Sequence, residues 1–292
     1  MNASIIKDKS LIGVSLGGRA LLVGRVQNGK VVKGVKRRIN NSETEGNVIK
    51  EVISAIQEVM DDTVTGIGFG APSLVDVENG IVYNVQKIKA WKQVYIREIL
   101  EDTFGVSVYV NNDANCFAVG ELYFGQGKKV ENLVGLIIGV GVGAGIIFKK
   151  HLYSGSNCGS GEYGNMPYRD HDLEHYLSDS YFDHKYGLDF EVLLRRAKKG
   201  DKIALAIFEQ YGFDLANAIK MIMYSVDPEM IILGGHIANG FEFFKEAMWE
   251  KLNTFVYKQS IEKLKVEVSK QEDIAVLGAA ALYFDANNKY IK

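Results

Sequence analysis

The feature that most constrains the fold is a unit of strand, glycine-rich turn and strand that occurs twice along the chain. Apolar runs flank Gly17 and Gly18 near the N-terminus, and similar runs at residues 133–139 and 144–148 flank a second glycine-rich turn. Because β-branched, apolar runs on both sides of a turn predict paired strands, the recurrence predicts two copies of one topology. We expect the two copies to face each other across a central cleft.

The segments between and after these units alternate in character. Strands are expected, from their apolar and β-branched residues, at residues 11–16, 20–26, 31–39, 64–69, 106–110, 133–139, 144–148 and 230–233. Helices are expected at residues 47–60, 94–103, 114–123 and 202–224, and in a last segment that begins near residue 276. The pair Asn28-Gly29 predicts a tight hairpin turn.

This order of elements predicts an α/β protein with mixed sheets covered by helices. We expect an N-terminal domain of residues 1–112, on which a C-terminal helix at residues 280–292 packs, and a larger second domain of residues 113–279. The crossover between the two domains would then follow the strand at residues 106–110.

A carboxylate follows that strand. In the run Asn111-Asn112-Asp113-Ala114, polar residues come directly after an apolar, alternating segment, where a sheet can present a reactive side chain. Asp113 is therefore a candidate general base. The alternative is that Asp113 only N-caps the helix expected at residues 114–123.

The glycine-rich turns are the second candidate feature. Glycine allows successive backbone N–H groups to point inward, so Gly17-Gly18 and Gly139-Val140-Gly141-Val142-Gly143 can approach phosphate oxygens. A tight hairpin without a ligand is the alternative for each turn. The spacing matches neither the dinucleotide fingerprint nor the P-loop, so a nucleotide would have to be held in another way.

Composition excludes several classes of protein. A length of 292 residues with 47% apolar and 24% charged residues is typical of a globular chain with room for two domains. With 34 basic and 36 acidic residues, the chain has no basic field, and no nucleic-acid partner is expected. No apolar run reaches the ~18 residues of a membrane span, so we expect a cytoplasmic protein without a membrane partner. Cys116 and Cys158 lack a Cys-x-x-Cys spacing and are expected to be reduced thiols.

Several short motifs, in order and spacing, resemble the ROK family of sugar kinases and sugar-responsive repressors. They are Leu16-Gly17-Gly18, Ala71-Pro72, Asn112-Asp113-Ala114-Asn115, Gly139-Val140-Gly141-Val142-Gly143-Ala144-Gly145, Gly161-Glu162-Tyr163-Gly164, Asp227-Pro228, Leu233-Gly234-Gly235 and Leu277-Gly278-Ala279-Ala280. The resemblance covers nearly the whole chain. It implies the actin-like ATPase fold, in which two ribonuclease-H-like domains of similar topology bind ATP and a hexose in the central cleft.

The resemblance also implies roles for individual residues. Asp113 would take the proton from the sugar hydroxyl that attacks the γ-phosphate of ATP, which is bound with Mg²⁺, and Asn112, Glu162 and Glu174 would bind sugar hydroxyls. The nucleotide would lie on glycines, with Gly17, Gly18, Gly139, Gly141 and Gly143 at the phosphates and Gly234 and Gly235 at the adenosine. A homo-oligomer, in this family a dimer, is also implied.

Departures from the family pattern affect the phosphate turns. Ser15 stands where family kinases carry the aspartate of the first turn, so the carboxylate that would hold Mg²⁺ through water is missing. Val140 replaces a threonine, which removes a hydroxyl donor from the second turn. Arg19 could bring positive charge to a phosphate in compensation, or could be a solvated arginine at a strand end.

The family's zinc-binding segment is changed as well. Asn165 replaces a histidine that binds both sugar and zinc, although its amide can still hydrogen-bond a hydroxyl. The cysteine-rich zinc loop is shortened to Pro167-Tyr168-Arg169-Asp170, so no structural zinc is expected. The alternative is the run His171-Asp172-Leu173-Glu174-His175, which matches the zinc motif of inverted metalloproteases. The remaining histidines, His151, His184 and His236, are expected at the surface or in turns.

Two functions are consistent with these residues. The first is an ATP-dependent hexose kinase, and the second is a catalytically impaired sugar- or nucleotide-binding regulatory protein, which Ser15 and Val140 favour. A direct DNA-binding repressor is not expected, because only about ten residues precede the first strand. The identity of the sugar is left open, since specificity would lie in the loops at residues 83–91 and 157–170.

Overall fold

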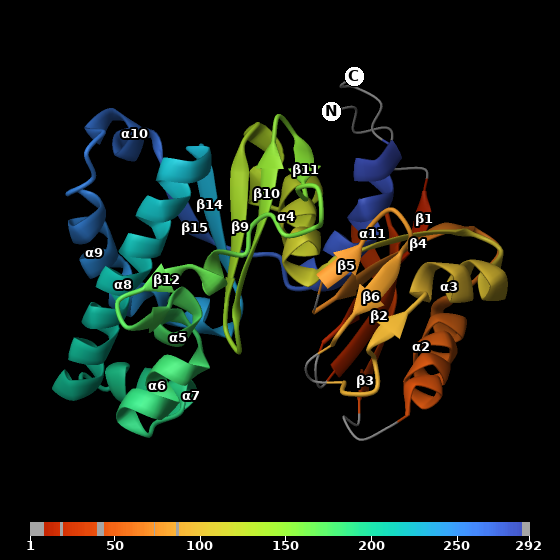
Figure 1. Cartoon of the computed structure of the whole chain (residues 1–292), viewed down its shortest axis with the longest axis horizontal. Helices are drawn as coiled ribbons and strands as arrows, with labels where there is room; N and C mark the ends of the chain where they lie inside the picture. The colour runs from red at the N-terminus through yellow and green to blue at the C-terminus, as the bar shows by residue number, and fades with distance from the viewer. Residues whose placement is uncertain (1–8, 18–19, 40–43, 73, 86–87, 288–292) are drawn as a thin grey trace. The chain divides into compact units, whose positions relative to one another are not determined.

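The computed structural model describes residues 9–17, 20–39, 44–72, 74–85 and 88–287 (Figure 1). The chain forms two compact units. The first consists of Met1–Lys129, Gly145–Ser160 and Lys270–Lys292, and the second consists of Val130–Ala144 and Gly161–Ser269.

A five-stranded sheet with the order β3-β2-β1-β4-β8 is the centre of the first unit. Its strands are β1 (Ser10–Leu16), β2 (Ala20–Gln27), β3 (Lys30–Arg38), β4 (Val64–Ala71) and β8 (Ser107–Asn112). Strands β1, β2 and β3 are antiparallel neighbours, whereas β4 is parallel to both β1 and β8. The predicted hairpin between β2 and β3 is confirmed, because Asn28 (φ 52°) and Gly29 (φ 72°) both adopt the positive φ that a type I′ turn requires.

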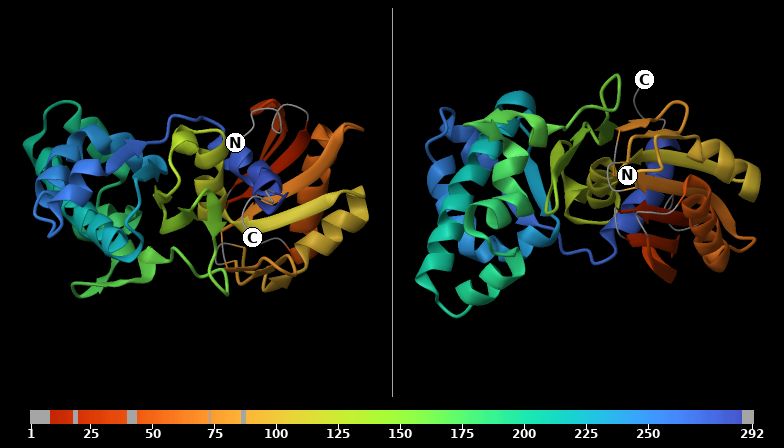
Figure 2. Two further views of the ribbon diagram at one scale, coloured as in Figure 1. Left: turned by 90° about the horizontal axis from the view of Figure 1, so that it is seen from above. Right: turned by 60° about the horizontal axis from the view of Figure 1, so that its bottom comes forward.

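Helices pack on both faces of this sheet. The helices of the unit are α2 (Glu45–Val59), α3 (Ile96–Phe104), α4 (Asp113–Tyr123) and α11 (Ile274–Asn287). Successive side chains of a strand point to opposite faces, and Ile12 of β1 joins the apolar core that α2 completes. Gly13 lies on the other face, where a Cβ would come within 1.9 Å of the carbonyl oxygen of Val276 in α11. Glycine in β1 thus allows α11, labelled in Figure 1 and drawn in the darkest blue in Figures 1 and 2, to lie close against the sheet.

Short elements complete the first unit. They are a small sheet of β5 (Leu74–Asp76), β6 (Ile81–Tyr83) and β7 (Gln93–Val94), the turn η1 (Gln126–Lys129), and β11 (His151–Tyr153), which pairs with the end of β10.

The second sheet has the strand order β11-β10-β9-β14-β15. Its further strands are β9 (Leu133–Ile138), β10 (Val142–Phe148), β14 (Met230–Gly234) and β15 (Lys265–Val268), and β14 is parallel to both β9 and β15. In both sheets the chain enters at the middle strand, adds two strands toward one edge, and later adds two strands on the other side. This order agrees with the predicted repetition of one topology.

The second unit is rich in helices. They are α5 (Leu173–Leu177), α6 (Asp179–Tyr186), α7 (Phe190–Ala197), α8 (Lys202–Val226), α9 (Phe241–Leu252) and α10 (Lys258–Lys263), with the turns η2 (Tyr163–Asn165) and η3 (His236–Gly240) and a ribbon of β12 (Pro167–Tyr168) and β13 (His171–Asp172). Helices α8 and α9 pack closely at Gly212, where a Cβ would come within 2.4 Å of the carbonyl oxygen of Phe244.

The predicted helices are confirmed with small shifts at their ends, and α8 extends to Val226. By their contacts, residues 113–129 belong to the first unit, because α11 packs along α4. The expected domain boundary at residue 112 stays a prediction. Among the described residues, no helix combines the length and the apolar character that crossing a membrane requires.

Candidate active site

Asp113 lies at the junction of β8 and α4. Helix α4 begins at Asp113, and its N-cap is Asn112, whose side-chain oxygen accepts a hydrogen bond from the backbone N–H of Ala114 at 2.8 Å. The alternative in which Asp113 caps the helix is therefore wrong. Asp113 Oδ1 also accepts from the Ala114 N–H at 2.8 Å, and its side chain is partly exposed. A partly exposed carboxylate at this position can reach a substrate proton.

The register of the first sheet relates Asp113 to the first glycine turn. Ser15 of β1 pairs with Gly70 of β4, and Gly70 pairs with Asn111 of β8. Since the three strands are parallel, the ends of β1 and β8 lie at the same edge of the sheet, about 10 Å apart. Gly17 follows β1 and Asp113 follows β8, so both lie at the carboxyl ends of these parallel strands, where α/β sheets commonly bind ligands.

Of the first glycine turn, only Gly17 lies within the described residues. Its N–H donates to the carbonyl oxygen of Ala20 at 2.8 Å. Gly18 and Arg19, which we expect at the phosphates, lie outside the described residues.

Buried polar groups support the β8–α4 junction. Asn111 is 4% exposed, and its side-chain oxygen accepts hydrogen bonds from the Asn112 N–H and from Asn115 Nδ2, both at 2.8 Å. Burial raises the pKa of the Cys116 thiol well above its ordinary value, and the negative charge of Asp113 raises it further. Cys116 and Cys158 are both buried, and their reduced state stays a prediction.

The second glycine turn, residues 139–143, is held from several sides. The Gly139 N–H donates to the carbonyl oxygen of Gly141 at 3.1 Å, and the carbonyl oxygen of Gly139 accepts from the Asp179 N–H at 2.8 Å. The side chain of Asp179 in turn lies 2.7 Å from Nε2 of His236. A Cβ at Gly139 would come within 3.1 Å of the His236 ring. Contacts from α6 and η3 therefore fix this turn.

Glu174 contacts the same turn. Its Oε2 accepts a hydrogen bond from the backbone N–H of Val142 at 2.9 Å, and a Cβ at Gly141 would come within 2.9 Å of that oxygen. A residue expected to bind sugar thus lies against a turn expected to bind phosphate. Val140, which replaces the family threonine, is 59% exposed.

Glu162 and Asn165 lie together at the ends of η2. Asn165 Nδ2 donates to Glu162 Oε2 at 2.9 Å, and both side chains are exposed. The preceding Gly161 has a φ of 88°, and a Cβ there would come within 1.9 Å of the carbonyl oxygen of Ala144. Only glycine can adopt this conformation without strain, so the backbone before Glu162 requires a glycine at position 161.

Gly234 is the last residue of β14, and Gly235 follows it before η3, as expected for a turn after a strand. Gly235 has a φ of 84°, and a Cβ there would come within 2.1 Å of the carbonyl oxygen of Ile138. Gly143 lies in β10, one residue after Val142. Their expected contacts with nucleotide stay predictions.

The alternative zinc motif does not assemble a metal site. The rings of His171 and His175 stack with their centroids 4.0 Å apart. Among the residues that the structure describes, no group of three or more His, Cys, Asp or Glu side chains could hold a metal ion. The absence of structural zinc in the protein stays a prediction.

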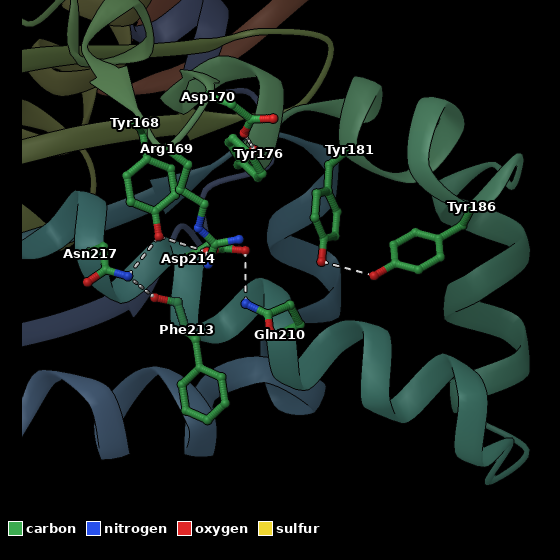
Figure 3. A network of polar contacts seen from close by, with 10 residues as sticks. All are labelled: Tyr168, Arg169, Asp170, Tyr176, Tyr181, Tyr186, Gln210, Phe213, Asp214 and Asn217. Carbon is green, nitrogen blue, oxygen red and sulfur yellow. Dashed lines mark hydrogen bonds and ion pairs between the residues drawn. The ribbon is translucent and has the colours of Figure 1, made fainter.

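Sequence reasoning missed two polar groups of the second unit. The Asp179–His236 pair joins residues 57 positions apart, and buried Asp214 contacts Tyr168 and Arg169 across 46 and 45 positions (Figure 3). Local patterns carry no signal for pairs so distant in sequence. A single aspartate within the apolar face of a long helix, as at Asp214, is the one sign that could have been noticed.

Comparisons of the sequence with known proteins show the family of this chain. The ROK family model matches residues 11–286. The chain is 28% identical to glucokinase of Thermotoga maritima, over 93% of this chain and 96% of that one. It is 30% identical to the xylose repressor of Caldicellulosiruptor bescii, over 75% of this chain and 62% of the repressor.

A solved structure shows the same fold. The ROK family glucokinase from Streptomyces griseus, in complex with glucose and AMPPNP, has a TM-score of 0.79 and 21% identity to this chain, covering 94% of this chain and 98% of the glucokinase. The predicted fold class, α/β with the actin-like ATPase fold, is confirmed.

Proposed function

We propose that this chain, which belongs to the ROK family, is an ATP-dependent sugar kinase that transfers the γ-phosphate to a hydroxyl of a hexose. The observation that carries the proposal is the position of Asp113. It follows β8 at the same edge of the sheet as Gly17 after β1, and the capping of α4 falls to Asn112. A carboxylate and a glycine turn at one sheet edge are what a base and a phosphate site require.

In this mechanism Asp113 accepts the proton of the attacking sugar hydroxyl, and the glycine turns donate backbone N–H groups to the phosphate oxygens. Asn112, Glu162, Asn165 and Glu174 bind the other hydroxyls of the sugar. The adenosine lies at Gly234 and Gly235.

Mg²⁺ would arrive with ATP and would neutralise phosphate charge. Ser15 cannot supply the carboxylate that family kinases use for this ion, so we assign no protein ligand to it. The protein is further proposed to be a cytoplasmic homodimer without DNA or membrane partners. The mass of the native protein in solution would test the dimer.

A coupled assay of ADP release tests the kinase function. Glucose, mannose, N-acetylglucosamine and N-acetylmannosamine are each offered with Mg-ATP, and we expect sugar-dependent turnover with at least one of them. ADP release that is the same with and without sugar, or none at all, contradicts the proposal. Calorimetric titration of the same sugars shows whether binding occurs without turnover.

A second function, an impaired sugar- or nucleotide-binding regulatory protein, is favoured by the exposed Val140 and by Ser15. The double substitution Ser15→Asp with Val140→Thr restores the family carboxylate and hydroxyl. If wild-type protein binds sugar or ATP without turnover, and turnover is found only in the double variant, the regulatory function is correct. If the double variant is no faster than an active wild type, these two positions do not limit catalysis.

A further inference from the structure

A fully buried carboxylate lies in the middle of α8 (Figure 3). Asp214 is 0% exposed; its Oδ1 accepts hydrogen bonds from the Tyr168 hydroxyl at 2.8 Å and from Arg169 Nη2 at 2.5 Å. Its Oδ2 accepts from Gln210 Nε2 at 3.2 Å, and Asn217 Nδ2 donates to the Tyr168 hydroxyl at 2.8 Å. Both oxygens of this buried carboxylate are therefore satisfied, as a buried charge requires, whereas the side chain of its charged partner Arg169 is 42% exposed.

Arg169 is held by rings as well as by charge. Its guanidinium lies 5.1 Å from the ring centroids of both Tyr168 and Tyr176, and these two rings meet edge to face at 5.3 Å. Burial and the hydrogen bond to Asp214 raise the pKa of Tyr168, so its hydroxyl remains a donor at neutral pH. The contact between the ribbon and α8 is thus specific in both charge and shape.

Tyr168 and Arg169 belong to the ribbon of residues 167–172, which leads directly into α5. The Leu173 N–H donates to the carbonyl oxygen of Met166 at 3.0 Å, and Asp172 caps α5 by accepting from the His175 N–H at 2.8 Å. Helix α5 has five residues, too few to be stable by itself. Helix α5 packs on η2, α6 and α8, and the ribbon adds a further attachment through the hydrogen bond from the Tyr176 hydroxyl to Asp170.

Helix α5 presents Glu174 to the second glycine turn. Glu174 Oε2 accepts from the Val142 N–H at 2.9 Å. A continuous series of contacts thus runs from Asp214 in α8 through the ribbon and α5 to residues 139–143.

We propose that Asp214 is a positioning residue, which through Tyr168 and Arg169 holds the ribbon and so sets the place of Glu174 against the second glycine turn. The contact with the turn stands by itself, and only its effect on sugar binding rests on the proposed function. A buried ion pair that merely stabilises α8 would instead affect the whole unit evenly.

Hydrogen exchange of the turn tests the positioning role without any substrate. In Asp214→Asn and in Tyr168→Phe, we expect the amide of Val142 to exchange about tenfold faster than in wild type, because its acceptor is no longer held. The control is Asp201→Asn, which keeps the oxygen that caps α8 but removes the negative charge that pairs with Arg196 at 2.8 Å and favours the N-terminus of that helix. It should lower the melting temperature and leave the exchange of residues 139–143 unchanged.

Kinetics give the second readout. With a sugar that the wild type phosphorylates, Asp214→Asn and Tyr168→Phe should raise KM for the sugar about tenfold and change kcat less than about twofold. Arg169→Lys, which keeps the charge and loses the planar stacking, should give an intermediate KM. Asp201→Asn should leave KM unchanged.

Each outcome decides between the alternatives. The proposal is overturned if exchange at residues 139–143 in Asp214→Asn and Tyr168→Phe is no faster than in Asp201→Asn at an equal loss of melting temperature. Tyr168→Phe keeps the ring contact with Tyr176 and so provides the test if Asp214→Asn does not fold. If the wild type phosphorylates no sugar, the kinase function fails, and the exchange measurement still decides the positioning role.

Discussion

The β8–α4 junction and the middle of α8 each hold an aspartate, and they hold it in opposite ways. Asp113 begins its helix, is partly exposed and accepts from a backbone N–H. Asp214 is 0% exposed and accepts from the side chains of Tyr168, Arg169 and Gln210. The carboxylate of Asp113 is open on one side, as the proposed base requires, whereas the carboxylate of Asp214 is enclosed by donors.

A buried aspartate and a partly exposed one meet different physical requirements. Removing one partner of a buried ion pair lowers protein stability by about 3–5 kcal/mol. A buried carboxylate such as Asp214 is therefore stable only where its donors are held in place. A general base must instead keep access to the proton that it takes. Substitutions at and around the two sites test whether they differ in this way.

Asp113→Asn should have the largest effect. Loss of a general base lowers kcat by about 10²–10⁴-fold, while the affinity for sugar is kept, because the amide retains the size of the side chain. The measurement is kcat and sugar affinity by the coupled assay and by calorimetry. Asp102→Asn, at an exposed position of α3, is the matched control and should change neither kcat nor the affinity for sugar. Turnover that persists in Asp113→Asn would show that Asp113 is not the base.

Gly278→Ala should have the next largest effect. Gly278 lies in α11, and its substitution should displace α4, the helix that begins with Asp113. A Cβ at Gly278 would come within 2.1 Å of the carbonyl oxygen of Cys116 in α4. Either α4 or α11 must move, which should lower the free energy of unfolding by about 3 kcal/mol in a urea titration and also lower kcat. Gly46→Ala in α2 meets nothing within 4 Å and should instead stabilise the protein slightly. Equal effects of the two substitutions would contradict close packing as the cause.

The two aspartates also differ in how far sequence could predict them. Asp113 can be predicted as a candidate base because a strand, a polar run and a helix are local patterns, and the hairpin at Asn28-Gly29 and α8 follow from equally local rules. The alternative in which Asp113 caps the helix is wrong by one residue, since Asn112 and Asp113 are both good N-caps and only the backbone dihedrals distinguish them.

Asp214 and the Asp179–His236 pair could not be predicted, because their partners are brought together only by the packing of the 167–172 ribbon near α8 and of η3 near α6. The grouping of residues 113–129 with the first unit has the same origin. It depends on the contact of α11, from the end of the chain, with α4. Local patterns therefore predict the elements and the turns, and tertiary contacts decide which side chains support them.

Substitutions at Asn112 separate capping from sugar binding. Asn112→Asp keeps an oxygen that can accept from the Ala114 N–H, so stability should change little, whereas KM for the sugar should rise because the amide donor is lost. Asn112→Ala loses both and should also lower the free energy of unfolding by about 1 kcal/mol. Thermal melts and sugar titrations of the two variants provide the measurement. An unchanged KM in both would limit Asn112 to capping.

The smallest expected effect concerns Asp285 of α11, an aspartate whose burial is only partly compensated. Its Oδ1 accepts from the Leu152 N–H at 3.2 Å, and burial raises its pKa despite that hydrogen bond and the nearby His151. With a folded pKa above the unfolded one, the native state binds the proton more tightly, so Asp285 favours folding at low pH and loses this contribution as pH rises through the folded pKa.

Asp285→Asn should therefore raise the free energy of unfolding at pH 7.5 by about 0.5 kcal/mol, with the gain disappearing near pH 3.5. The opposite sign is expected at Asp76, whose pKa is lowered by hydrogen bonds from Asn79. Asp76→Asn should lower the melting temperature at pH 7.5 and converge with wild type in acid. Melting curves of both variants at the two pH values give the signs directly, and the same sign at both positions would contradict burial as the cause at Asp285.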